Sequence, residues 1–145
     1  MKRLRCRGVA AIEAALVMAG LAPLLVLALN MGRLAINGAA ADRAASNAAR
    51  YLSTVPLESL HDSSRRATVL ESARYLIDQT LAAANIEQAA WHVEFMCDLG
   101  HCDELLPGSI PGSVAVLLNV DSQPILDFGD PPVRLTVYAE VGRDD

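Results

Sequence analysis

Aromatic residues are scarce in this 145-residue chain, at 4% of the total, and the sequence holds one tryptophan. It also lacks the G-x-S-x-G elbow, the phosphate-binding loop and the H-E-x-x-H zinc motif. We therefore expect a protein that is not an enzyme and needs no cofactor. After the first eight residues the chain has 8 basic and 17 acidic residues, a net charge of −9, which argues against a nucleic-acid partner.

Charge is absent from Ala14 to Gly32, and this run is the most informative part of the sequence. A helix of that length reaches about 28 Å, close to the roughly 30 Å of a bilayer's hydrocarbon core. The eight residues at the N-terminus carry four basic side chains and no acid. The pattern predicts a transmembrane helix over residues 9–32, with the N-terminus in the cytoplasm and the rest of the chain across the membrane.

Three other interpretations fit parts of this segment. A cleaved secretory signal has a shorter apolar region, and a small-residue site such as 39–41 lies well beyond this one. A plain, unprocessed anchor would need neither a leader nor an acid in the span. A buried core helix of a soluble protein would not require the basic flank.

Glu13 is the exception within the apolar segment. A carboxylate at mid-membrane costs about 2.5–3.5 kcal/mol, and less near the interface, so an acid in this position is a functional candidate. The alternative is a side chain that is solvated at headgroup level. Gly8 ends the basic leader, and the string from Arg7 to Glu13 reads RGVAAIE.

That string resembles the start of type IV prepilins and pseudopilins, which a membrane aspartyl peptidase cuts after the glycine. The eight-residue leader, the continuation AAIEAALV and the later stretch AADRAASNAARYL are most similar to TadE-like minor pseudopilins of the tight-adherence (Tad/Flp, type IVb) pilus system. The resemblance covers roughly residues 5–52. The family usually has an aromatic residue where this chain has Ala14, which leaves the subfamily open.

The resemblance implies that prepilin peptidase cuts between Gly8 and Val9, so that Glu13 becomes the fifth residue. Glu13 of one subunit would then pair with the Val9 amine of its neighbour and set the axial register. The implied partners are the peptidase, sister pilins or pseudopilins, the inner-membrane assembly platform and the lipid bilayer. The implied location is the inner membrane, with the head in the periplasm or outside the cell. The rival is an unprocessed single-pass protein with a periplasmic binding domain.

Beyond the span, periodicity predicts an α+β head. A helical stalk over 33–56 continues the first helix, which would run from about Ala10 to Leu52, with a weak point at Asn37-Gly38. A second amphipathic helix spans about 62–84, with Asp62 or Ser63 as its cap and Asn85 at its end. Alternating residues then predict a small antiparallel sheet of about three strands. The expected divisions are a leader (1–8), a transmembrane helix (9–32), a stalk (33–56) and a head (57–145).

Cysteine is rare, with three residues, and Cys6 falls in the leader. Cys97 and Cys102 flank a glycine-containing turn, which predicts a disulfide outside the cytoplasm. Zinc held by His92, Cys97, His101 and Cys102 is an alternative, although His92 and Cys97 have opposite strand parity. Two acidic groups are alternatives for calcium, without the spacing of a calcium loop: Asp98, Asp103 and Glu104, or Asp121, Asp127 and Asp130. We therefore expect no metal.

Overall fold

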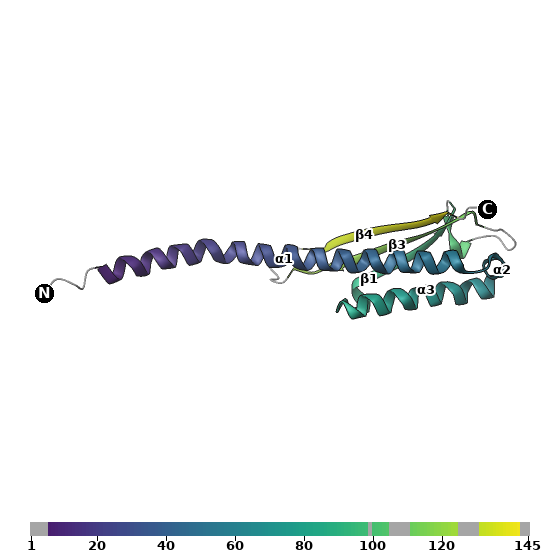
Figure 1. Cartoon of the computed structure of the whole chain (residues 1–145), viewed down its shortest axis with the longest axis horizontal. Coiled ribbons are helices and arrows are strands. Elements are labelled where there is room, and N and C mark those ends of the chain that lie inside the picture. The colour runs from purple at the N-terminus through teal and green to yellow at the C-terminus, as the bar shows by residue number, and fades with distance from the viewer. Residues whose placement is uncertain (1–5, 99, 105–110, 125–130, 143–145) are drawn as a thin grey trace.

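A computed structural model describes residues 6–98, 100–104, 111–124 and 131–142 of the chain (Figure 1). Its helices are α1 (Cys6–Thr54), α2 (Leu57–His61) and α3 (Ser63–Ala83), and two short 3₁₀ turns are η1 (Gln88–Ala90) and η2 (Cys102–Glu104). Its strands are β1 (Trp91–Cys97), β2 (Gly100–His101), β3 (Ser113–Ser122) and β4 (Val133–Gly142). The expected α+β class is confirmed.

Helix α1 is the longest element, with 49 residues, and extends about 74 Å at 1.5 Å per residue. It passes through the predicted weak point at Asn37-Gly38 without a break. Asn37 is buried there, and its Nδ2 donates a 3.0 Å hydrogen bond to Oγ of Ser122 at the end of β3. This contact ties the middle of α1 to the sheet.

The sheet is antiparallel throughout, in the order β2-β1-β3-β4. The three long strands match the alternating segments of the sequence. The two-residue strand β2 was not predicted; it folds back on β1 because Asp98 takes a left-handed conformation, with φ at 55°. Register places Val93, Val116 and Leu118 on the buried face, while the neighbouring residues in each strand point to the other face.

The core lies where α1 packs against α3 and against strands β3 and β4. The buried face of α1 consists almost entirely of small side chains, which let its neighbours approach closely. They are Ala41, Ala44, Ala45, Ala48 and Ala49, followed by Leu52. Helix α3 contributes Leu70, Ala73, Ile77 and Leu81 to the same cluster.

Both ends of α3 are capped as the sequence predicted. The Asp62 carboxylate accepts hydrogen bonds from the backbone N–H and the hydroxyl of Ser64, which lower the pKa of Asp62. At the other end Asn85 adopts φ 58°, and the N–H of Ile86 donates to the carbonyl of Leu81. With the N–H of Asn85 donating to the carbonyl of Ala82, this is a Schellman cap, and Ile86 and Leu81 are both buried in the core cluster.

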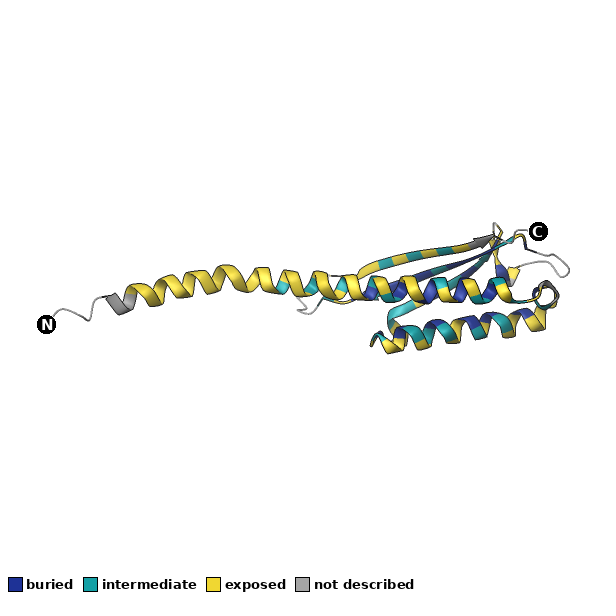
Figure 2. Ribbon diagram, viewed as in Figure 1, coloured by how far each residue is buried: buried dark blue, intermediate teal, exposed yellow. Residues whose placement is uncertain are grey.

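The head begins earlier than the expected boundary at residue 57. Packing starts at Asn37, so residues 37–54 of α1 belong to the core of the head and do not form a separate stalk. The alanine-rich face explains this difference, because it is a packing surface for α3 and the sheet. What projects from the head is the N-terminal part of α1 (Figure 2).

Candidate functional site

The most unusual surface of the molecule is the N-terminal part of α1, from Val9 to Ile36. Most of its residues are exposed (Figure 2), and none of them is buried; Val26, Asn30 and Leu34 are half-buried. An 18-residue window in this helix reaches a mean hydropathy of 2.3, and none of that window is buried. The exposed large apolar side chains are Val9, Ile12, Leu16, Val17, Met18, Leu21, Leu24, Leu25, Leu27, Leu29, Met31 and Ile36.

An apolar surface of this size is not stable in water, because each large aliphatic side chain gains about 1.5–3 kcal/mol on full burial. None of the residues from Val9 to Ile36 is buried against the described head, so this part of α1 is not a core helix of that head. A long apolar helix near the N-terminus is a property of both membrane anchors and signal sequences. Pro23, inside the helix, is tolerated in membrane helices.

Glu13 lies on this exposed helix, one turn after Val9, and both side chains are exposed. Residues four apart share a helix face, so Val9 and Glu13 point the same way. The backbone of Gly8 lies in α1, two residues after the first described residue of that helix, Cys6.

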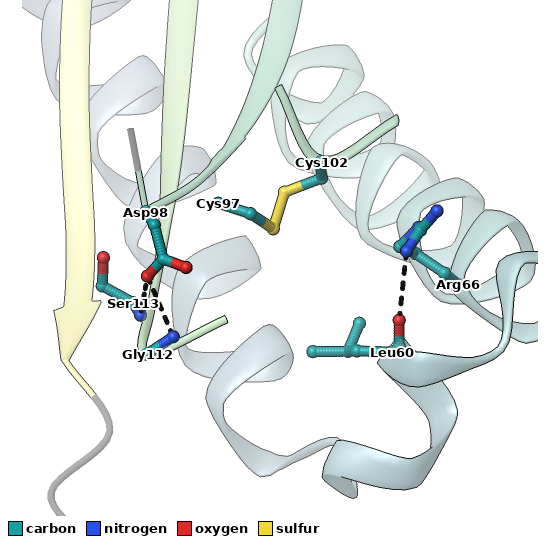
Figure 3. The surroundings of a disulfide bond; sticks show 7 residues. All are labelled: Leu60, Arg66, Cys97, Asp98, Cys102, Gly112 and Ser113. Atoms are coloured by element: carbon teal, nitrogen blue, oxygen red, sulfur yellow. Dashed lines mark hydrogen bonds between the residues drawn. A yellow bond between two sulfur atoms is a disulfide. The ribbon is translucent and has the colours of Figure 1, made fainter. Parts of the chain in front are cut away.

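Cys97 and Cys102 are joined by a disulfide at the opposite end of the molecule, with Cα atoms 4.8 Å apart (Figure 3). Both are buried, Cys97 at the end of β1 and Cys102 at the start of η2. Between them the Asp98 carboxylate accepts hydrogen bonds from the N–H groups of Gly112 (2.9 Å) and Ser113 (3.0 Å). The disulfide joins the end of β1 to the start of η2, and Asp98 binds the β1–β2 turn to the start of β3.

The zinc alternative does not assemble in the part of the chain that the structure describes. The disulfide uses both sulfur atoms of the zinc set, and His92 lies 3.5 Å from Glu94 on the outer face of the sheet. The Asp98 carboxylate already accepts hydrogen bonds from two backbone N–H groups. Among the described residues no three His, Cys, Asp or Glu side chains form a metal-binding group. Asp127 and Asp130 lie outside the described residues, as does the side chain of Asp103.

The outer face of the sheet carries polar pairs, two between β3 and β4 and one within β4. Arg134 donates to Asp121 at 2.9 Å, which raises the pKa of Arg134. Thr136 donates to Asn119 at 2.7 Å. Tyr138 donates to Glu140, and this hydrogen bond raises the pKa of Tyr138. These pairs satisfy one another on a solvated surface.

Two buried polar contacts were not found from the sequence. The bond from Asn37 to Ser122 joins residues 85 positions apart. Arg66 is 5% exposed, and its Nη1 donates to the carbonyl of Leu60 at 3.4 Å (Figure 3). Both hold helices in the head, and neither had a local sequence signal.

Comparison of the chain with models of protein families, with curated proteins and with solved structures found no match.

Proposed function

We propose that this chain is a minor pseudopilin-type structural subunit that helps to assemble a Tad/Flp-like type IVb pilus or a related secretion filament. The observation that carries this proposal is the division of α1. One continuous helix presents an uncovered apolar half with a single acid, Glu13, and then packs through its other half into a small α+β head. A subunit that is stored in a membrane and then packed into a filament needs this layout.

Processing after Gly8 would change the setting of Glu13. In the uncut chain this carboxylate lies inside α1, which begins at Cys6 among the described residues. After the cut, Val9 carries a new amine and Glu13 lies next to the positive end of the helix dipole. An unpaired charge in an apolar setting is costly and a paired one is tolerated, so a neighbour's Val9 amine would select one axial register.

The test is the N-terminus of the membrane-extracted protein, made with and without an active prepilin peptidase. We expect Val9 as the first residue with the peptidase and Met1 without it. Gly8→Leu should leave the full chain, because a pocket shaped for glycine excludes the larger side chain. Met1 on wild-type protein in the presence of the peptidase would favour the unprocessed anchored domain instead.

Glu13→Ala distinguishes a Glu13 that pairs with a neighbour's Val9 amine from a Glu13 that is only solvated at headgroup level. The substitution removes a charge that is costly in the membrane, so insertion should be unchanged or better. Cross-linking to partner subunits should nevertheless fall sharply, because the Val9 amine loses its acceptor. Glu71→Ala, an exposed acid on α3, is the matched control. Normal assembly of the Glu13→Ala variant would contradict the register role.

A further inference from the structure

A groove of about 570 Å³ opens at the end of the head nearest the exposed part of α1. Its walls are α1 between Ala28 and Asn37, the chain just after α3 at 84–90, and the end of β3 at 121–123. In Figure 1 the end of α3 and the start of β4 lie beside α1 at this level. The volume is within the roughly 300–1,000 Å³ of small-molecule sites.

The position of the groove along α1 sets its depth in a membrane. Ala28 and Leu29 line it within the charge-free run, Gly32 is the last residue of that run, and Arg33 follows in the same wall. On a membrane-inserted α1, the groove therefore crosses from the hydrocarbon edge into the headgroup layer. Apolar side chains also line the groove, including Leu29, Ile36 and Ile86.

The groove contains charges of both signs. Its cation is Arg33, and its carboxylates are Glu87 and Asp121. Asp121 is already engaged by Arg134 at 2.9 Å. Arg33 and Glu87 are exposed, and neither forms an ion pair with another described residue. One positive and one negative group thus remain available in the same groove.

We propose that this groove binds a phospholipid whose zwitterionic headgroup ends in a primary ammonium. Arg33 binds the phosphate, Glu87 accepts hydrogen bonds from the ammonium, and the apolar wall around Ile36 contacts the first part of an acyl chain. A guanidinium suits phosphate, and a primary ammonium has N–H donors that a quaternary ammonium lacks. An anionic headgroup without a cation would leave Glu87 without a partner, and the two negative charges would repel each other. The inference rests on the membrane span of the proposed function.

Trp91 provides the reporter for this site. It is the only tryptophan of the chain, and it directly follows Ala90, which lines the groove. The full chain is reconstituted into vesicles that contain phosphatidylethanolamine, phosphatidylcholine and phosphatidylglycerol in equal parts. In three parallel samples, one lipid class at a time carries brominated acyl chains, and quenching of Trp91 fluorescence is measured. Flotation of the vesicles reports membrane association separately.

We expect brominated phosphatidylethanolamine to quench Trp91 more strongly than the other two lipids, as if it were enriched about fivefold near the groove. A preference of about fivefold is what one partly exposed ion pair contributes. Arg33→Gln and Glu87→Gln should each reduce the enrichment to nearly one. Arg43→Gln and Glu71→Gln, exposed charges outside the groove, should keep it.

Equal quenching by all three lipids, or preference for phosphatidylglycerol, would overturn the proposal. Absence of quenching in vesicles that still float with the protein would overturn the lipid site and leave the membrane span intact. Loss of flotation would refute the span, and with it the proposal.

Discussion

The two halves of α1 invert the usual relation between hydropathy and burial. Residues 9–36 are rich in leucine and valine and have no buried residue, whereas residues 37–54 bury a row of alanines and carry charged residues on the outside. In a protein surrounded by water alone, the more apolar half would be the one inside. The cover for the N-terminal half must therefore come from outside the described head, and a bilayer or partner helices can supply it.

The contrast also separates the two kinds of packing. Alanines in the second half let the sheet and α3 approach closely, and Leu52 is the large side chain that is fully buried there. In the first half the large side chains spread around the helix, as contact with lipid on all sides requires. One helix thus combines a tightly packed segment with a segment adapted to an apolar solvent.

Two arginine substitutions, one in each half of α1, should have the largest and most different effects. Leu24→Arg should impair membrane insertion by about 2.5–3.5 kcal/mol and leave the thermal unfolding of the head in detergent unchanged. Ala45→Arg, at a position with 0% exposure, should do the reverse and cost at least about 3 kcal/mol of head stability. Membrane fractionation and thermal unfolding measure the two effects. If both variants unfold the head, the halves are not independent.

Cys102→Ser tests the far end of the head. The disulfide closes a short loop, so its loss should lower the free energy of unfolding by about 2 kcal/mol in the chain-entropy model. Membrane insertion should not change. Denaturant unfolding gives the energy, and alkylation of the native protein without reduction should label no thiol at Cys97 or Cys102. Full labelling of both in native protein would argue against a head outside the cytoplasm.

Asn37→Ala tests the border between the halves. The variant leaves the buried Ser122 hydroxyl without its donor, which should cost about 1 kcal/mol of head stability. Asn47→Ala, an exposed asparagine on the same helix, is the control and should be nearly neutral. Equal effects in chemical denaturation would mean that the contact to Ser122 does not fix the border.

The smallest expected effect is on the pH dependence of the stability of the head. Because the folded pKa of Asp62 is lowered, its cap stabilises α3 above the ordinary pKa of 3.8 and is lost as the pH falls through the lower, folded value. Asp62→Asn keeps a capping side chain that does not titrate. Unfolding between about pH 5 and 2 should therefore be less pH-dependent in this variant. Identical pH dependence would exclude a role for this carboxylate.

Much of the fold was predictable, because long elements carry long patterns. The 3.6-residue period indicated α1 and α3, the two-residue period indicated β1, β3 and β4, and local cap chemistry at Asp62 and Asn85 indicated the ends of α3. The pairing of Cys97 with Cys102 also followed from a short spacing.

The remainder depended on contacts between distant parts of the chain or on very short elements. The two residues of β2 and the five of α2 are too few to show a period. The early start of the head could not be read locally, since Asn37 is held by Ser122, 85 residues away. The groove near Arg33 likewise combines segments from α1, the end of α3 and β3.

Protease protection tests the central claim most directly, that the exposed half of α1 lies in a membrane with the head outside the cytoplasm. Right-side-out vesicles of the host's cytoplasmic membrane, carrying the full chain, are digested, and the surviving peptides are identified by mass spectrometry. We predict a protected peptide covering about residues 9–32 and digestion of the head once its disulfide is reduced. Protection of the head, or complete digestion of the segment around Leu21 and Leu24, would contradict the account.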